Sequence, residues 1–424
     1  MEKFTFVEGG VAAAEGFTAS GVLNKIKESR TTYDTALIYS DCVCAAAGVF
    51  TQNRVKAECV KFTKGQIADG KAQAVIMNSG NANACTGTQG FENARKEACA
   101  VAEKLNISEG NVLVCSTGVI GQQLPVEKIL DGLDRSVALL SKKGNIEARQ
   151  AIMTTDTKYK ETALKVQIGG KTVTMGTMAK GSGMIHINMG TMLSLVTTDC
   201  AISPKMLEKA LKLSVAGSYN CVSIDGDTST NDTLLILANA KAGNPEITGE
   251  GEDFDLFVEA LNVLNVQMAK KIAADGEGAT RLVTCNVTGA DTVENARGLA
   301  KAVICSNLVK AAFFGADANW GRILDAMGYS GFEFTPEKTS VSFMSRKNSK
   351  RYFEDGTVNG GEQKTVKVFD HGVPLDFDEG LAKEILTEEA VEILVELEDG
   401  KACGTAWGCD LTYDYVKING DYRT

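Results

Sequence analysis

The chain has 424 residues, 44% of them hydrophobic and 23% charged, and it contains only five prolines. This composition is typical of a folded globular protein and excludes a long disordered linker, while the length suggests two or three folding units. Acidic residues outnumber basic ones by 54 to 44, and the net charge of -10 argues against nucleic acid as a partner.

The sequence carries no pattern of export or membrane insertion. Its start, MEKFTFVEGG, has no basic segment followed by an apolar core, and no run of about 18 apolar residues occurs. The twelve cysteines are scattered and form no CxxC pair, which favours reduced thiols over a disulfide scaffold. We therefore expect a cytoplasmic protein that does not span a membrane.

Short apolar runs bounded by turn residues predict buried strands, because each run is too short for a helix. In chain order they cover residues 38–50, 73–78, 111–117, 193–199 and 233–240. Longer segments with an apolar stripe at helical spacing predict helices at residues 93–106, 125–140, 203–220, 253–276 and 292–314. The tail, residues 390–420, has the pattern of a β-hairpin or meander with a glycine-rich turn. Mixed α/β layers follow, without the regular alternation of a doubly wound sheet.

The segment MAKGSGMIHINMGTMLSLVTTD, residues 178–199, places a glycine-bracketed loop directly before a short apolar strand. Gly190 has no Cβ, so its carbonyl is open to attack by the hydroxyl of Thr191. Cleavage there would give Thr191 a free α-amino group with a pKa of about 8, which can act as the base for its own hydroxyl. Alone, this pattern is a weak signal, because threonines at strand starts more often cap or pack.

The amino-acid sequences of several segments support the prediction of a nucleophilic threonine. GSGMIHINMGTMLSLVTTD closely resembles the cleavage and nucleophile motif of the ornithine acetyltransferase family. The segments NSGNANACTG, STGVIG, AIMTTDT, DGDTSTNDT, DGEGATR, GADANWGRI and DLTYDYVKINGDYRT also resemble the family, in the family's order and over nearly the full length. One departure is Ile187, where many relatives have proline, which affects the rigidity of the loop rather than its chemistry.

The resemblance implies a precursor that cuts itself between Gly190 and Thr191. Residues 1–190 would form the α chain and residues 191–424 the β chain. The two would stay intertwined in one layered α/β (α+β) body of mixed sheets and helices with N-terminal-nucleophile architecture, assembled as α2β2. The implied reaction is ping-pong: Thr191 takes acetyl from N2-acetyl-L-ornithine and passes it to L-glutamate. It requires neither a metal nor a cofactor, and the sequence leaves open whether acetyl-CoA also serves as donor.

Thr117 and Gly118 lie between a predicted strand and a predicted helix, where a glycine lets backbone N–H groups approach a ligand. By resemblance they form the oxyanion hole; the alternative is an ordinary strand-to-helix turn. An amino-acid substrate needs a cation for its carboxylate, and ornithine needs an anion for its ammonium group. The resemblance assigns these roles to Lys180 and Glu277, although most lysines and glutamates are solvated surface charges.

Further substrate contacts are implied by the resemblance alone. They are Thr154, with Thr155 as a close competitor, the nucleophile Thr191 itself, and Asn419 and Thr424 near the C-terminus.

Other polar groups receive weaker assignments. The acids of DGDTSTNDT, Asp225, Asp227 and Asp232, lack the glycine and distal glutamate of a calcium loop, so a polar turn near the active site is favoured over a metal site. Packing is favoured over a cleft role for Asn319, Trp320 and Arg322. The two histidines, His186 and His371, are given no catalytic role, and their scarcity favours an amine base.

Two other functions remain open from the sequence. A related N-terminal-nucleophile aminopeptidase or amidohydrolase would use water in place of glutamate as the acceptor. A non-catalytic amino-acid-binding protein would keep the pocket without cutting itself, and would run as an intact 45.0 kDa chain in denaturing electrophoresis.

Overall fold

The computed structural model describes residues 3–186, 192–352 and 360–420. The chain forms two compact units. The first consists of residues 1–181, 187–220 and 228–268, and the second of 182–186, 221–227 and 269–424, apart from the positions outside the description. In the described ranges, no helix is long and apolar enough to cross a membrane.

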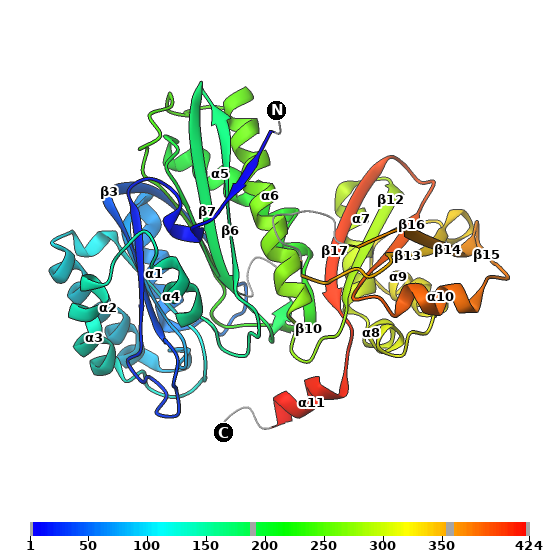
Figure 1. The fold of residues 1–424 in the computed structure, drawn as a ribbon, viewed down its shortest axis with the longest axis horizontal. Helices are drawn as coiled ribbons and strands as arrows, with labels where there is room; N and C mark the ends of the chain where they lie inside the picture. Colours follow the sequence, from blue (N-terminus) through cyan, green and yellow to red (C-terminus); the bar gives the residue numbers. More distant parts are fainter. Residues whose placement is uncertain (1–2, 187–191, 353–359, 421–424) are drawn as a thin grey trace. The chain divides into compact units, whose positions relative to one another are not determined.

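The first unit is built on a mixed nine-stranded sheet (Figure 1). Along the sheet the strands are β1 (Thr5–Val7), β6 (Lys160–Ile168), β7 (Lys171–Lys180), β9 (Leu193–Thr198), β11 (Thr233–Ala238), β3 (Thr35–Phe50), β4 (Lys71–Asn78) and β5 (Val112–Ser116), and β2 (Phe17–Val22) also pairs with β3. The β9–β11 and β4–β5 pairs are parallel and the other pairs antiparallel. The runs predicted at 73–78, 111–117, 193–199 and 233–240 are confirmed as strands, and each is continuously buried because the sheet is covered.

Helices cover this sheet and bury its apolar side chains. They are α1 (Glu58–Gln66), α2 (Gly87–Leu105), α3 (Val126–Ala138), α4 (Asn145–Ala151) and α5 (Pro204–Ala216), with short 3-10 turns at Gly10–Ala12, Ile67–Asp69 and Glu109–Asn111. Helix α6 (Glu252–Ala274) begins in the first unit and ends in the second. Helices α2 and α3 lie side by side, as Figure 1 shows. Ser203 begins α5 as predicted, because its hydroxyl accepts a hydrogen bond from the Met206 N–H.

The second unit contains a six-stranded sheet. Its order is β15 (Val373–Pro374), β14 (Gln363–Asp370), β13 (Ser340–Arg346), β16 (Ala390–Glu396), β12 (Leu282–Ala290) and β17 (Ala402–Cys409). Its helices are α7 (Val293–Cys305), α8 (Asn307–Phe314), α9 (Trp320–Gly328), α10 (Glu379–Leu386) and α11 (Tyr413–Gly420), and a 3-10 turn lies at Pro336–Lys338. Another 3-10 turn, Tyr219–Cys221, lies where the chain passes from the first unit to the second. A separate ribbon pairs β8 (Ile185–His186) with β10 (Ser223–Thr228). The predicted mixed α/β class is thereby confirmed.

Two predicted elements were wrong in detail. The helix expected at 292–314 is two helices, because Ser306 adopts an extended backbone and its hydroxyl caps the second of them. The tail is not a hairpin: β16 and β17 both pair with β12, which lies between them. After β17 the chain forms helix α11, whose residues are not buried, so no apolar pattern marked it.

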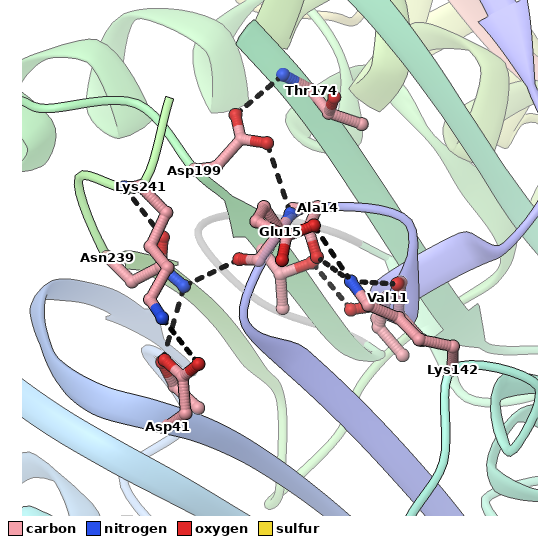
Figure 2. A network of polar contacts seen from close by, with 12 residues as sticks. Val11, Ala14, Glu15, Asp41, Lys142, Thr174, Asp199, Asn239 and Lys241 are labelled. Atoms are coloured by element: carbon pink, nitrogen blue, oxygen red, sulfur yellow. Dashed lines mark hydrogen bonds and ion pairs between the residues drawn. The ribbon is translucent and has the colours of Figure 1, made fainter. Parts of the chain in front are cut away.

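Strand β9, which begins two residues after Thr191, lies between β7 and β11 in the sheet. Its far end is anchored by a polar network, shown in Figure 2. The Asp199 carboxylate accepts hydrogen bonds from the N–H groups of Thr174 (2.7 Å) and Glu15 (3.1 Å), and the Asn239 amide donates to the Glu15 carbonyl (2.8 Å). Segments from both sides of the predicted cut therefore build one sheet, and β9 is held in register within it.

Glu97 on α2 is an unexplained buried acid and yields a prediction on pH dependence. It is fully buried, and neither carboxyl oxygen has a hydrogen-bond partner among the described residues. Burial raises its pKa to about 8 from 4.5. Because the unfolded chain loses this proton at lower pH than the folded one, the free energy of unfolding falls as pH rises from 4.5 to about 8.

Replacing Glu97 with leucine should remove this loss. We expect the free energy of unfolding, measured with urea at about pH 8, to be on the order of 3 kcal/mol higher in Glu97→Leu than in the parent. Near pH 5 the two free energies should differ little. The exposed Glu103 of the same helix is the control, and Glu103→Leu should leave the pH dependence unchanged. An unaltered slope in Glu97→Leu would contradict the assignment of a buried neutral acid.

Candidate active site

The predicted cleavage residues, Gly190 and Thr191, lie outside the described residues, as do Ile187 and Thr424. The strands on either side of them are described. Lys180, the last residue of β7, pairs with Leu193, the first residue of β9, in an antiparallel register. Residues 181–192 therefore connect two adjacent strands, and the predicted substrate lysine is the sheet neighbour of the residue two positions after Thr191.

Thr117 and Gly118 form a tight turn at the end of β5. The Thr117 N–H continues the ladder between β4 and β5 by donating to the Asn78 carbonyl at 2.9 Å. It is therefore not available to an oxyanion. Neither the Thr117 hydroxyl nor the Gly118 N–H has a hydrogen-bond partner within the described ranges. These two groups are the donors that the turn can offer to a developing negative charge.

The shape of this turn requires glycine at position 118. Gly118 has a φ of +134°, and a Cβ there would lie 2.5 Å from the Asn81 nitrogen. The close approach arises because the Gly80–Asn81 backbone packs directly on the turn. Asn81 also holds the following loop, since its amide donates to the carbonyls of Gln122 (3.2 Å) and Gln123 (3.3 Å). The segments NSGNANACTG and STGVIG are thus parts of one rigid structure.

The substrate residues predicted in the first unit, Thr154 and Lys180, are held by one acid that sequence reasoning missed. The Asp156 side chain is fully buried and accepts hydrogen bonds from the N–H groups of Thr154 (3.1 Å) and Gly181 (2.8 Å). Its oxygens lie 2.7 Å from the Lys160 ammonium and 3.9 Å from that of Lys180. Thr154 is thereby fixed close to Lys180; the choice between Thr154 and Thr155 stays a prediction.

Electrostatics keep Asp156 ionised. Burial would raise the pKa of Asp156, but the ammonium groups of Lys160 and Lys180 and the Gly181 N–H outweigh burial and hold this pKa well below its ordinary value. The signal for Asp156 was present in the sequence, since it lies in AIMTTDT. The fully buried Lys160 gave no signal, because lysines are rarely buried.

The second unit brings together Glu277 and Asn419. The Asn419 amide donates to the Glu277 carboxylate at 2.7 Å, and only 6% of Glu277 is exposed. A Cβ at Gly183 would lie 2.5 Å or less from both Glu277 carboxylate oxygens, so a larger residue there would push this carboxylate away. The Glu277 N–H also donates to the Ser182 carbonyl at 3.0 Å.

Asp225 and both histidines have polar partners within the described residues. Asp225 accepts hydrogen bonds from the N–H groups of Met184 (2.6 Å) and Ile185 (2.8 Å), as expected for a polar turn. No group of three or more His, Cys, Asp or Glu within the described residues could hold a metal ion. His186 contacts Ser223 at 3.1 Å, and burial lowers its pKa to about 4, so it is neutral at physiological pH. The exposed His371 pairs with Glu398 at 3.1 Å.

Packing accounts for the GADANWGRI residues. Asn319 caps α9 by accepting from the Arg322 N–H at 3.3 Å, and the Arg322 side chain donates to the Leu308 carbonyl at 2.8 Å. Trp320 stacks on Phe369 with ring centroids 4.9 Å apart.

Comparison with known proteins covers nearly the whole chain. It is 50% identical over 418 residues to the arginine biosynthesis bifunctional protein ArgJ of Caldanaerobacter subterraneus subsp. tengcongensis, with 99% of both chains covered. It is 47% identical over 420 residues to the protein of the same name from Symbiobacterium thermophilum, with 99% of this chain and 100% of the relative covered. Both relatives are named as proteins of arginine biosynthesis.

A sequence model of the ArgJ family matches residues 18–424, and the chain belongs to this family. Among solved structures, the arginine biosynthesis bifunctional protein ArgJ of Bacillus halodurans is 40% identical, covering 54% of this chain and 98% of its own, with a TM-score of 0.47. The ornithine acetyltransferase of Mycobacterium tuberculosis complexed with ornithine is 41% identical, covering 45% of this chain and 100% of its own, with a TM-score of 0.41.

Proposed function

We propose that this chain is an acetyltransferase of arginine biosynthesis that moves acetyl from N2-acetyl-L-ornithine to L-glutamate through an acetyl-Thr191 intermediate. Membership of the ArgJ family supports the biosynthetic role. The observation that carries the acyl-transfer chemistry is the turn at Thr117 and Gly118. Its two donors are unengaged within the described residues and rigidly backed by the Gly80–Asn81 backbone, as an oxyanion hole requires.

The proposed sequence of steps begins with cleavage between Gly190 and Thr191. The new α-amine then takes the Thr191 hydroxyl proton while the oxygen attacks the acetyl carbonyl of acetylornithine. The tetrahedral oxyanion is stabilised by the Thr117 hydroxyl and the Gly118 N–H, and its collapse breaks the bond to ornithine, whose nitrogen leaves with the proton. The glutamate amine next attacks the acetyl carbonyl of the ester and loses a proton to the Thr191 amine. The bond between the carbonyl carbon and the Thr191 oxygen then breaks, the amine returns the proton to this oxygen, and N-acetylglutamate leaves.

Charge complementarity assigns the substrate contacts in this proposal. Lys180 binds the α-carboxylate shared by both amino acids, and Glu277, with Asn419 beside it, binds the side-chain ammonium of ornithine. Thr154 and the C-terminal Thr424 make further substrate contacts in this proposal. The steps use no metal or cofactor. The relatives are named bifunctional, and we propose that the second activity acetylates glutamate from acetyl-CoA as an alternative donor.

The same proposal covers the assembly. The cleaved protein is a cytoplasmic α2β2 heterotetramer of residues 1–190 and 191–424. Size-exclusion chromatography with light scattering checks this state, and a mass of a single α and β pair would contradict it.

Thr191→Ala tests the function directly. We expect this variant to remain an intact 45.0 kDa chain and to gain no acetyl group, whereas the parent gives pieces of 190 and 234 residues. After incubation with acetylornithine, mass spectrometry of the parent should show one added acetyl group on the fragment that begins at Thr191. Thr191→Ser, which keeps a hydroxyl, is the control and should retain cleavage.

The alternative hydrolase is separated by the acceptor. If acetate release from acetylornithine is fast and independent of glutamate, the protein is an amidohydrolase instead. Full activity in Thr191→Ala would refute both enzyme mechanisms, because each requires this nucleophile.

A further inference from the structure

The segment DGDTSTNDT contains a buried side chain for which the proposed steps have no use. Asn231 is 5% exposed and stands two residues before β11. Its amide nitrogen donates to the Ala82 carbonyl at 2.5 Å and to the Ser116 carbonyl at 2.8 Å. Its amide oxygen accepts from the Thr230 hydroxyl at 2.6 Å, which fixes the orientation of the amide group.

The two carbonyls belong to the two walls of the oxyanion hole. Ser116 is the residue before Thr117. Ala82 lies directly after Gly80–Asn81, the backbone that packs on Gly118, and its own N–H donates to the Val119 carbonyl at 3.0 Å. The Asn231 side chain therefore joins the segment of Ala82 to the segment of Ser116. The distance between these segments determines where the Thr117 hydroxyl and the Gly118 N–H point.

The same segment is joined to the strand of the nucleophile. The Thr233 N–H donates to the Met192 carbonyl at 2.8 Å, and Thr233 pairs with Leu193 in the parallel ladder of β11 and β9. The Thr233 hydroxyl also donates to the Asn231 carbonyl at 2.9 Å. Only Asp232 lies between Asn231, which contacts the proposed oxyanion hole, and Thr233, which binds the main chain of Met192 directly after Thr191.

We propose that Asn231 is a positioning residue that fixes the oxyanion hole relative to the strand that begins behind the nucleophile. This inference rests on the proposed function. Asn231 acts through Ser116 and Ala82. Among the described residues it donates no hydrogen bond to Thr154 or Lys180, which Asp156 holds instead. Its loss therefore affects stabilisation of the transition state more than substrate binding.

Asn231→Ala is the test, with Asn244→Ala as a matched control. Asn244 is 6% exposed, and its amide donates to the carbonyls of Ala201 (3.1 Å) and Pro245 (2.8 Å) and contacts the Cys200 sulfur at 3.6 Å. The Asn231 amide nitrogen has the same kinds of partner, two carbonyls and the Cys59 sulfur at 3.7 Å. Each amide oxygen also accepts one hydrogen bond, from the Thr230 hydroxyl in Asn231 and from the Ala201 N–H in Asn244. The two variants lose the same number of amide hydrogen bonds, but only Asn231 contacts the segments of the proposed oxyanion hole.

Kinetics are measured on protein whose cleavage has been verified by mass. We expect kcat for acetyl transfer to fall about 10- to 100-fold in Asn231→Ala, with KM for acetylornithine nearly unchanged. Asn244→Ala should lower the melting temperature to a similar degree and keep kcat. Asn231→Gln keeps both donors on a longer side chain; it serves if the alanine variant does not fold, and should show a smaller loss of kcat with unchanged KM.

A double variant distinguishes positioning from a general structural role. If Asn231 acts through the oxyanion hole, Asn231→Ala should reduce kcat little further in a Thr117→Ala background. Independent multiplication of the two losses, or equal losses of kcat in the Asn231 and Asn244 variants, would overturn the inference.

Hydrogen exchange keeps this test separate from that of the proposed function. Asn231→Ala should speed exchange of the amides in residues 79–84 and 116–121, and Asn244→Ala should not. A parent protein that transfers no acetyl would refute the proposed function alone. Unchanged exchange in those two segments would refute the positioning role, whatever the reaction.

Discussion

Gly118→Ala is expected to reduce kcat for acetyl transfer by about 100-fold or more, equivalent to about 3 kcal/mol of transition-state stabilisation. The added Cβ would lie 2.5 Å from the Asn81 nitrogen and closer still to the Gly80 carbonyl carbon. Both are main-chain atoms that cannot yield as a flexible side chain would. The turn must therefore move, and the Gly118 N–H and the Thr117 hydroxyl move with it.

Gly121→Ala is the matched control for this prediction. Gly121 lies in the same loop with a φ of +81°, so alanine is strained there as well, but a Cβ would meet no atom within 4 Å. We expect both variants to lose some thermal stability because of φ, and only Gly118→Ala to lose kcat. Steady-state kinetics and thermal melts of the cleaved proteins check this. Equal activity in the two variants would show that the turn is not the oxyanion hole.

The sequence predicted local elements well where burial is continuous. The runs at 193–199 and 233–240 are central strands of a covered sheet, so their apolar character follows directly from their environment. The prediction for the tail was wrong because strand pairing is non-local. Strand β12 lies between the two strands expected to form a hairpin, although it stands more than 90 positions before β16 in the chain. Helix α11 was not predicted because it buries none of its residues, so the sequence has no apolar stripe there.

In the candidate site, too, local features could be predicted and long-range contacts could not. The turn at Thr117 and Gly118 was predicted from a glycine between a strand and a helix, and its role from the family resemblance. The structure adds that a positive φ and a close backbone approach require this glycine. The supports behind this turn could not be predicted. Asn231 holds the turn through contacts that span 115 and 149 positions, and no local pattern encodes them. Asp156 stood in a recognised segment, but its role depends on Lys160, whose complete burial contradicts the ordinary behaviour of lysine.

Asp156→Asn is expected to destabilise the protein by about 3 kcal/mol or more, the cost typical of removing one partner of a buried ion pair. The change removes the carboxylate that lies 2.7 Å from the buried Lys160 ammonium. Urea unfolding at neutral pH measures the loss. Asp134→Asn is the control: Asp134 pairs with Lys104 at the surface, and the same chemical change there should alter the unfolding curve little.

The pH dependence of this loss follows from the lowered pKa of Asp156. A carboxylate with a depressed folded pKa contributes its stability fully above its ordinary pKa of 3.8, and loses it as pH falls toward the folded pKa. The difference in unfolding free energy between parent and Asp156→Asn should therefore be constant near neutrality and shrink below about pH 4. A difference that instead grows on acidification would contradict an ionised Asp156 in the folded protein.

A double variant separates the two roles of this acid. Asp156→Leu with Lys160→Met replaces the ion pair by apolar groups of similar size, which is often neutral for stability. Unfolding should then recover toward the parent value. The N–H groups of Thr154 and Gly181 would still lack their acceptor, so KM for acetylornithine should stay raised, by about 10-fold on the basis of one lost charge-assisted hydrogen bond. If KM recovers together with stability, Asp156 supports the fold alone and does not position the substrate residues.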